Sequence, residues 1–584
     1  MTYFLGIFGG AGPNPSAALV RDRELVALVE EERLSRIKCA PNALPISSIQ
    51  EVLSLEKIGL DDVTGIGFAW DVDRYQRQTK LHLDNLRETY NDKMEVYNEG
   101  IEQSLRLSFS RERLLHNLKI GLARAGLSLD PQKVTFLPHH LCHAASSFYF
   151  SGFSESAILT VDGSGEEFCS VGWIGDSSGL RQVYNYELPH TLGGYYSTFT
   201  EFLGFKPNEH EGKLMGLAPF GSFRSDLQDK LELVLPFDPE TGDYRVMPEY
   251  RYFGTRLQGQ TFSEELVELF GCMRRPRESF NSEHKDLAFN VQWRLEQILV
   301  GLARRLASET GSGNLCLAGG VAMNCKANGV LAKQEFIENL FVQPASSDNG
   351  VGLGAAMILA DQKDSVSGKP QRLRHCYYGR AYSNDQIEAA LRHSKLEFFR
   401  LGNAAETAAE LVSEGKIIGW FQGRAEFGAR ALGARSILAD PTDTSMLERI
   451  NYEVKNRERW RPFCPSVLDD DFDSYFEKTF CDEFMITAYE VKPEVRSLIP
   501  SAVHIDGTAR PQRVRKEDCS RYYLFISELK KRTGHGVCLN TSFNIQGEPM
   551  VYTPAEAIRC FAGTGLDALV IGDWCTLKPG VGLR

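Results

Sequence analysis

Two histidines four residues apart, His139 and His143, stand in the string PHHLCHAASSFYFSGF. On a helix this spacing puts both imidazoles on one face, where they can bind one metal ion. Asp162 follows at the end of an expected strand in TVDGSGE, and Asp348 lies in the SSDNG loop. Two imidazoles and two carboxylates suit Fe(II), Mn(II) or Zn(II). The alternative is that the histidines only cap or pack a helix, but with His140 they are three of only 12 histidines in the chain, which favours function.

Two glycine-rich strings could approach a nucleotide. In EHEGKLMGLAPFG, Lys213 and Gly216 stand beside a small-residue turn, where backbone amides can come close to a phosphate. In LAGGVAMNCKANG, a strand runs through Gly319 and Gly320 into a helix, whose first N–H groups and positive dipole end attract an anion. The two glycines would let a ribose or adenine ring come close. Ordinary glycine-rich loops remain the alternative.

Basic residues in the last third of the chain stand beside Gly, Ser, Asn and aromatic residues, not beside Glu at helical spacing. Guanidinium groups bind phosphate bidentately, so this array predicts an anion pocket. A solvated surface position remains the alternative for any one of these residues, although it explains the whole set poorly. The set is Arg424, Arg430, Arg435, Lys455, Arg457, Arg461, Arg510 and Arg513.

The secondary structure that must position these residues is expected to be mixed α/β. A strand–turn–strand pattern at the start recurs at 157–174, and this weak internal similarity predicts a duplicated lobe. The expected strands cover 3–8, 16–20, 25–29, 417–421, 536–539 and 568–571. The expected helices start at 30 and cover 72–128, 285–310, 404–413 and 554–561.

A polar segment at 361–385, with Ser, Gly and Pro and no apolar period, predicts a linker between a domain at 1–360 and one at 386–584. The 584 residues allow several structural units at roughly 100–200 residues each. Apolar residues at 42% and charged residues at 24% exclude a disordered, collagen-like or coiled-coil chain. The net charge of −12 argues against a general nucleic-acid-binding surface but not against local basic pockets.

Cysteine usage and hydropathy bear on the compartment. The 13 cysteines stand mostly in apolar strings, and no C-x-x-C pair occurs. The start, MTYFLGIFGG, has no basic leader, and the sequence contains no run of 18 apolar residues. We therefore expect a cytoplasmic protein with neither a nucleic acid nor a membrane as its partner.

Together these strings resemble the O-carbamoyltransferase family, typified by the tobramycin, cephamycin and nodulation-factor carbamoyltransferases. The resemblance runs nearly end to end. Its strings are SAALV and EERLSRIK near the start, HHLCHAASSF, LTVDGSGE, HEGKLMGLAPFG, GGVAMNCKANG and SSDNGVGLGAA further on, and GRAEFGARALGARSILADP, KNRERWRPFCPS, HIDGTARPQ and NTSFNIQGEP in the second half.

The resemblance implies a fold and an activity. The first domain would be a duplicated actin/sugar-kinase-like domain, similar to the kinase-like subunit of the universal tRNA threonylcarbamoylation machinery. The second would be a YrdC-like α/β domain. In this family the second domain makes carbamoyl-adenylate from carbamoyl phosphate and Mg-ATP. The first domain then moves the carbamoyl group to an alcohol beside a bound Fe(II), with another divalent metal as the alternative.

The resemblance also implies residue roles, carried over string by string. The expected metal ligands are His139, His143, Asp162 and Asp348. The expected contacts to carbamoyl-adenylate are Lys38, His143, Lys213, Gly216, Gly320 and Asn324. The pocket for ATP and carbamoyl phosphate would contain Arg430, Lys455, Arg461, Arg510, Asn540, Ser542 and Asn544. The expected catalytic residues are His139, His143, Lys38 and Arg430.

This sequence departs from the family pattern at two places. Family members carry a His-Asp pair where Pro13 and Asn14 stand here, so the general base and the acceptor pocket are open. The usual Gly-Pro-Arg is Gly428-Ala429-Arg430, which keeps the arginine.

The acceptor and the exact reaction also leave alternatives. A bulky secondary metabolite with a free hydroxyl is the expected acceptor. A tRNA threonylcarbamoyl-type transferase and a non-catalytic nucleotide sensor are the alternative functions. Aromatic residues in or next to 72–128 would line an entrance or pack within a surface helix pair; they are Trp70, Tyr75, Tyr90 and Tyr97.

Overall fold

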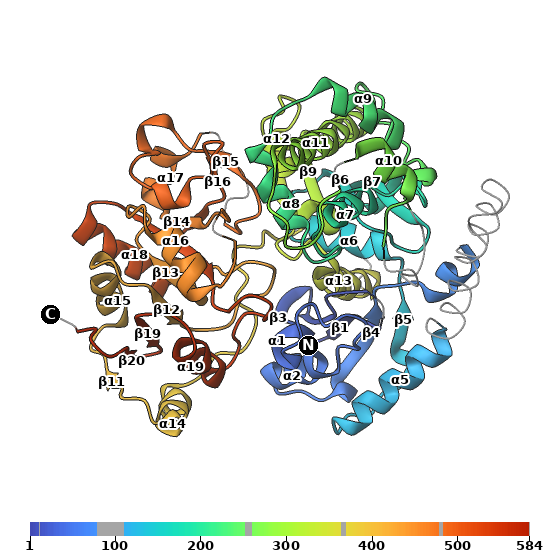
Figure 1. The fold of residues 1–584 in the computed structure, drawn as a ribbon. Helices are drawn as coiled ribbons and strands as arrows, with labels where there is room; N and C mark the ends of the chain where they lie inside the picture. The colour runs from blue at the N-terminus through green and yellow to red at the C-terminus, as the bar shows by residue number, and fades with distance from the viewer. Residues whose placement is uncertain are drawn as a thin grey trace. The chain divides into compact units, whose positions relative to one another are not determined.

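A computed structural model describes the chain except residues 11, 79–109, 252–259, 272, 364–369, 459, 478–479, 481–482 and 583–584. The chain forms two compact units (Figure 1). The first is Met1–Val26 with Pro41–Arg372, and the second is Ala27–Ala40 with Leu373–Arg584. These extents differ from the expected domains: residues 27–40 fold with the second unit, and so does the described part of the expected linker from 373 on.

Two five-stranded sheets form the centre of the first unit, and they share one topology. Counted within each sheet, the strands lie in the order third, second, first, fourth, fifth. In both, the first strand is antiparallel to the second and parallel to the fourth. The repeated order agrees with the duplicated lobe expected from the sequence. The strands are β3 (Glu24–Glu30), β2 (Ser16–Arg21), β1 (Tyr3–Phe8), β4 (Val63–Phe68) and β5 (Val134–Phe136), and β10 (Asn339–Val342), β9 (Asn314–Ala318), β6 (Ser156–Val161), β7 (Phe168–Asp176) and β8 (Gly179–Glu187).

Two helices of the first unit, α6 (His139–Phe148) and α13 (Val351–Lys363), pack backbone against backbone. A Cβ added to Gly354 would lie 1.8 Å from the carbonyl oxygen of Cys142 in α6, and one on Gly6 would lie 1.7 Å from that of Gly352. Only glycine permits this approach, which fixes the start of α13, and the loop before it, next to α6.

The remaining helices of the first unit flank these sheets (Figure 1). The longest begins with a capping box at Asn281 and ends before Gly311, which has φ 72°. The described helices that flank the sheets, of which α11 is the longest, are α2 (Ile46–Glu56), α5 (Arg111–Arg124), α7 (Leu192–Phe202), α8 (Glu211–Leu217), α9 (Ser225–Val234), α10 (Glu264–Phe270), α11 (Ser282–Thr310) and α12 (Cys325–Ala332).

The expected helical stretch at 72–128 is described only in part. Its helix α5 buries Leu114, Leu118 and Leu122 on one face, so it is amphipathic as expected. Tyr90 and Tyr97 lie outside the described residues.

An eight-stranded mixed sheet forms the centre of the second unit. Its strands lie in the order β11-β20-β19-β12-β13-β18-β14-β17. They are β11 (Phe399–Arg400), β20 (Trp574–Leu577), β19 (Ala568–Ile571), β12 (Ile418–Phe421), β13 (Arg435–Ala439), β18 (Val537–Ser542), β14 (Cys464–Leu468) and β17 (Gln512–Val514).

Helices cover both faces of this sheet. Ile418 and Trp420 of β12 belong to a core with α15 (Ala404–Ser413) and α18 (Ser520–Thr533), whereas Phe421 belongs to a core with α14 (Asn384–Ser394) and α19 (Pro554–Ala562). This is the α/β unit expected from the sequence, and the expected helices 404–413 and 554–561 match α15 and α19 closely. Among the described residues, no helix is both long and apolar enough to cross a membrane.

Candidate metal centre and anion pocket

The two histidines expected to bind a metal lie on the first two turns of α6. His143 Nε2 is 3.1 Å from His139 Nε2 and 2.8 Å from Asp162 Oδ2. His139 Nε2 is 3.5 Å from Asp348 Oδ1. One donor atom from each of the four residues lies within 4.8 Å of the others. The structure therefore brings together all four residues that the sequence selected.

Strand ends bring the carboxylates to the histidines. Asp162 directly follows β6, and Asp348 begins the short 3-10 helix that follows β10. Both strands run parallel to β9 in one sheet, so their carboxyl ends meet at the same edge. Helix α6 lies against this sheet (Figure 1). The short distances from its two imidazoles to Asp162 and Asp348 place them at that edge.

The orientation of His139 suits a cation. Its Nδ1 lies 3.0 Å from the carbonyl oxygen of Ala69 and donates a hydrogen bond to it, so Nε2 is the nitrogen that faces the cluster and could bind a cation in place of a proton. Burial alone would lower the pKa of His139, but contacts with Asp162 and Asp348 raise it well above its usual value. Burial, and then the charge of Asp162, raise the pKa of Asp348. A divalent cation would relieve this crowding, because it replaces one shared proton with two positive charges.

His140 has a different role from its neighbours. Its ring nitrogens lie 2.9 Å from Thr160 Oγ1 and 3.0 Å from the carbonyl oxygen of Phe168. Burial, and then the charge of His139, lower its pKa to about 3. His140 is therefore a neutral packing residue rather than a ligand.

Two further residues adjoin the candidate centre: Glu166, which was missed from the sequence, and Trp70, which was expected to line an entrance or to pack within a helix pair. Glu166 accepts hydrogen bonds from the backbone N–H groups of His139 and Asp71, and burial raises its pKa to about 7. The Trp70 ring packs against His139 with the centroids 4.7 Å apart. Trp70 thus supports a candidate ligand. Glu166 follows Asp162 by four residues in one string, which was the available signal.

Metal binding should stabilise the first unit. We expect Fe(II), Mn(II) or Zn(II) at 100 times its Kd to raise the free energy of unfolding by about 2.7 kcal/mol, and a chelator to reverse this. Calorimetry of the metal-free protein, under anaerobic conditions for Fe(II), measures the shift. His139→Ala should remove it, whereas His116→Ala, on the exposed side of α5, should keep it. A shift that survives His139→Ala would contradict this site.

The residues expected to contact carbamoyl-adenylate in the first unit divide into two groups. A Cβ on Gly320 would lie 3.0 Å from Asp162 Oδ1, so this glycine borders the candidate metal centre. Asn324 Oδ1 instead accepts from the N–H of Ala327 at 3.1 Å as the cap of α12, and its amide pairs with that of Gln292. Lys213 and Gly216 lie on α8, where Lys213 Nζ is 5.7 Å from the Phe205 ring centroid.

The expected anion pocket of the second unit contains a deeply buried lysine. Lys455 is 3% exposed, and its Nζ donates to Ser542 Oγ at 3.3 Å and to Asn544 Oδ1 at 2.8 Å, as well as to both backbone carbonyls. Burial, and then the charge of Arg457, lower the pKa of Lys455 well below its usual value. The ammonium is thus held by neutral oxygens next to further positive charge, an arrangement that an anion would stabilise.

Arginines adjoin this lysine. Burial, and then the charge of Arg461, lower the pKa of Arg457 to about 9. Burial lowers the pKa of Arg461, against the opposing charge of Glu458 at 3.8 Å, and Arg510 lowers it further. Arg510 lies with Nη2 3.0 Å from the Sγ of Cys464. These clustered guanidinium groups make the site positive. A phosphate would suit it, because an anion relieves their mutual repulsion.

Asn540 lies on β18, directly opposite Cys464 in the sheet. Its Nδ2 donates to the carbonyl oxygen of Ala431 and to Ser466 Oγ, both at 3.1 Å. Its Oδ1 is buried without a hydrogen-bond partner among the described residues. A buried unpaired acceptor is costly, so this oxygen is a candidate contact for a ligand donor.

Family models match most of the chain. The description "Carbamoyltransferase N-terminus" matches residues 13–357, and "Carbamoyltransferase C-terminus" matches residues 409–578. The chain belongs to the carbamoyltransferase family. The resemblance derived from the sequence is confirmed.

Curated relatives agree with this assignment. Nodulation protein NolNO of Sinorhizobium fredii is 36% identical over 96% of this carbamoyltransferase and 78% of its own length. The 3'-hydroxymethylcephem-O-carbamoyltransferase of Amycolatopsis lactamdurans is 30% identical over 63% of this chain and 65% of its own. An uncharacterized protein of Synechocystis, sll1178, is 35% identical over 99% of this chain and 97% of its own.

Three arginines of the sequence array serve the fold of this carbamoyltransferase instead of its pocket. Arg435 is 1% exposed, donates to four backbone carbonyls and covers the ring of Phe421 at 3.6 Å. Arg424 donates to the carbonyls of residues 378 and 379, and Arg513 pairs with Asp469 and Asp473. The sequence could not separate them from the pocket residues, because all stand among small residues.

The structure places Lys38 with the second unit, in the segment 27–40, whereas the other residues expected to contact carbamoyl-adenylate lie in the first. Its Nζ is 3.2 Å from Glu32 Oε2. Arg430 also belongs to the second unit, two residues after Gly428.

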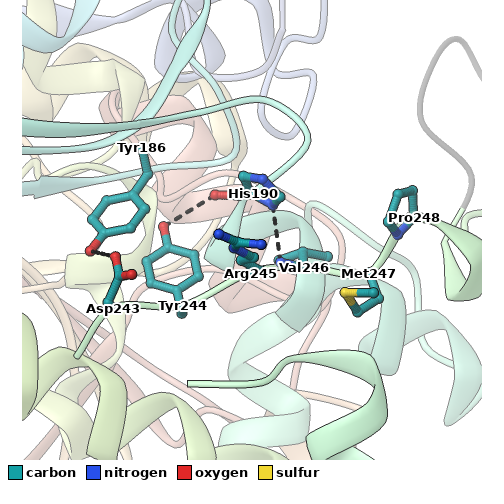
Figure 2. Close-up of a pocket in the computed structure, with 8 residues that line it drawn as sticks. All are labelled: Tyr186, His190, Asp243, Tyr244, Arg245, Val246, Met247 and Pro248. Atoms are coloured by element: carbon teal, nitrogen blue, oxygen red, sulfur yellow. Dashed lines mark hydrogen bonds between the residues drawn. The ribbon is translucent and has the colours of Figure 1, made fainter. Parts of the chain in front are cut away.

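One cavity of the first unit, of about 430 Å³, contains none of the expected site residues. Figure 2 shows Tyr186 stacked on Tyr244 and His190 beside Arg245. The neighbouring Thr191 donates to the carbonyl oxygens of Asp162 and Gly163. The cavity wall is thus tied to the loop that carries a candidate metal ligand.

Proposed function

We propose that this carbamoyltransferase makes carbamoyl-adenylate from carbamoyl phosphate and ATP in its second unit, and carbamoylates an alcohol at the metal centre of its first unit. The observation that carries the proposal is the presence of two different buried centres, one in each unit. One offers two imidazoles and two carboxylates for a cation, and the other offers a lysine and arginines for anions. We further propose an actin/sugar-kinase-type fold for the first unit and a YrdC-type fold for the second.

The first half-reaction balances with one water. Carbamoyl-adenylate keeps the α-phosphate of ATP and none of the phosphorus of carbamoyl phosphate. Water therefore releases phosphate and leaves carbamate, whose oxygen attacks the α-phosphorus while the bond to pyrophosphate breaks. The product is a mixed anhydride in which AMP is the leaving group.

Residues of the second unit have clear tasks in this step. Lys455 and the guanidinium groups of Arg461 and Arg510 would neutralise the phosphates and hold them in line for attack. The unpaired Oδ1 of Asn540 suits the N–H₂ of the carbamoyl group, which donates hydrogen bonds.

The second half-reaction would use the first unit. The alcohol oxygen attacks the carbamoyl carbon, the bond to AMP breaks, and the alcohol proton leaves with a base. His139, His143, Asp162 and Asp348 would hold a divalent cation, which when bound supplies Lewis acidity at the developing negative charge. Gly320 leaves room beside Asp162 for the nucleotide. Pro13 and Asn14, which replace the family His-Asp pair, cannot supply the base.

Mass spectrometry tests the proposal directly. The protein is incubated with Fe(II), ATP, carbamoyl phosphate and panels of alcohols, including secondary metabolites with a free hydroxyl. We expect addition of one carbamoyl group to an acceptor, with pyrophosphate, phosphate and AMP released. Release of pyrophosphate that does not depend on carbamoyl phosphate would contradict the first half-reaction. Tight binding of bulk tRNA at moderate salt would favour a tRNA-directed transferase instead.

A further inference from the structure

Four consecutive charged residues near the N-terminus are buried although neither centre uses them. Glu30, Glu31, Glu32 and Arg33 are each 6% exposed or less. They lie at the end of β3 and in α1 (Glu31–Ser35), within the segment 27–40 that folds with the second unit. Charged side chains are seldom buried unless they are paired, and buried pairs contribute little net stability. Their burial therefore calls for a role other than stability.

Two of these residues form hydrogen bonds with the backbone of one glycine of the second unit. The N–H of Gly428 donates to Glu30 Oε1 at 2.6 Å, and Arg33 Nη2 donates to the carbonyl oxygen of Gly428 at 2.8 Å. Arg33 also lies 3.6 Å from Glu30 Oε2 and 2.9 Å from Glu32 Oε1, so its charge is balanced. Both backbone groups of Gly428 are thus fixed by side chains that are themselves ion-paired.

The glycine adopts a backbone conformation that needs such support. Its φ is 93°, in the region that side chains with a Cβ rarely adopt. Arg430 follows two residues later in the same loop. A glycine is free to take other conformations, so the fixed peptide groups on both of its sides decide where the loop places Arg430.

The far end of this loop is fixed as well. Glu426 Oε1 accepts hydrogen bonds from the backbone N–H groups of Leu432, Ala434 and Arg435 at 2.9, 3.2 and 3.1 Å. Two buried carboxylates therefore bind the chain on either side of Arg430. Glu30 binds Gly428 before it, and Glu426 binds the backbone within residues 432–435 after it. Hydrogen bonds thus hold the chain on both sides of Arg430.

The same N-terminal segment also contacts a second loop of the second unit. Arg36 donates to the carbonyl oxygens of Met550 and Pro549 at 2.6 and 2.8 Å, and lies 3.4 Å from Glu556. Residues 549–550 follow the turn that carries Ser542 and Asn544, the partners of Lys455. The segment 27–40 thus contacts both the loop of Arg430 and the loop that follows Ser542 and Asn544.

We propose that Glu30 and Arg33 are positioning residues for adenylate formation: they clamp Gly428 and so hold in place Arg430, which the sequence assigns to the expected anion pocket. The inference rests on the proposed function, because it assigns these residues to the first half-reaction. Lysine cannot replace Arg33, since it lacks the planar fork that bonds Gly428 and both carboxylates at once.

The experiment compares Arg33→Ala and Arg33→Lys with wild type in the full chain. The matched control is Arg392→Ala, an exposed arginine of α14 that pairs with Glu388. Pyrophosphate release dependent on carbamoyl phosphate is measured, and amide hydrogen exchange is followed in peptides covering 427–432. We expect a fall in kcat of about 100-fold for Arg33→Ala, as for a catalytic group displaced by about 1 Å, with faster exchange in these peptides. Arg33→Lys should show both changes, and Arg392→Ala neither.

Chemical rescue separates positioning from general stability. Millimolar guanidinium should restore part of the kcat of Arg33→Ala, whereas ammonium at the same ionic strength should not. If Arg33→Ala does not fold, faster exchange and reduced kcat in a folded Arg33→Lys support the clamp. Unchanged exchange, or unchanged kcat despite faster exchange, overturns it. If wild type itself releases no pyrophosphate, the proposed function fails, while exchange in 427–432 still reports whether Arg33 holds Gly428.

Discussion

Replacing His143 with Ala should abolish transfer of the carbamoyl group to the alcohol, while ATP and carbamoyl phosphate still yield pyrophosphate. His143 Nε2 lies at the centre of the donor set, 2.8 Å from Asp162 Oδ2 and 3.1 Å from His139 Nε2. Its loss leaves three donors and a buried gap, so metal affinity should fall steeply. The anion pocket belongs to the other unit, and its residues are unchanged. We expect product formation to fall by at least about 100-fold, as when one group that stabilises the developing negative charge is removed.

Product is measured by mass spectrometry and pyrophosphate by a coupled assay on the same sample. The control is His116→Ala, an exposed histidine of the same unit, which should change neither activity. Bound metal, measured by elemental analysis, should fall in His143→Ala alone. Loss of both activities in a folded His143→Ala would contradict the division of the reaction between two centres.

Replacing Arg510 with Ala should have the converse effect. Pyrophosphate release should fall by about 100-fold or more, and overall transfer with it, because no carbamoyl-adenylate forms. Metal binding by the first unit should remain. The physical reason is the loss of a forked cation that lies against Cys464 and next to Arg461, in the pocket where phosphate charge must be neutralised.

Arg513→Ala provides a matched control. Arg513 stands three residues later but pairs with Asp469 and Asp473, so its loss should leave pyrophosphate release near wild type. Arg510→Lys should recover only part of the activity, since an ammonium keeps the charge but not the bidentate geometry. Equal losses in Arg510→Ala and Arg513→Ala would show a structural effect instead of a role in the pocket.

Spacing, residue type and the family resemblance were sufficient to select the four residues of the candidate metal centre, which the structure brings together. Histidines four apart share one helix face, and residue type together with the family resemblance selected the two carboxylates. Only the structure shows that these carboxylates follow parallel strands of one mixed sheet, whose carboxyl ends meet at one edge. Glu166 was missed, and Trp70 was expected to line an entrance or to pack within a helix pair and not beside His139, because supporting a ligand leaves no periodic signal in the sequence.

The anion pocket was predicted less completely. The array of basic residues indicated a pocket, yet Arg424, Arg435 and Arg513 bind backbone carbonyls or carboxylates elsewhere. An arginine among small residues can cap a loop as well as bind a phosphate, and only burial and partners distinguish the two. Burial lowers the pKa of Arg435 too, but the charge of Glu426 opposes that effect. At Lys455 and Arg457, neighbouring positive charges add to the effect of burial.

The sequence by itself determined the mixed α/β character, the duplicated lobe, the family and the four candidate metal ligands, because these depend on periodicity, order and local motifs. Only the tertiary structure decided that residues 27–40 fold with residues 373–584. Contacts between positions about 400 residues apart, such as Arg33 with Gly428, leave no periodic pattern in either segment. Such contacts form when buried charged side chains pair with distant groups in the packed chain. A single sequence contains no signal for that pairing.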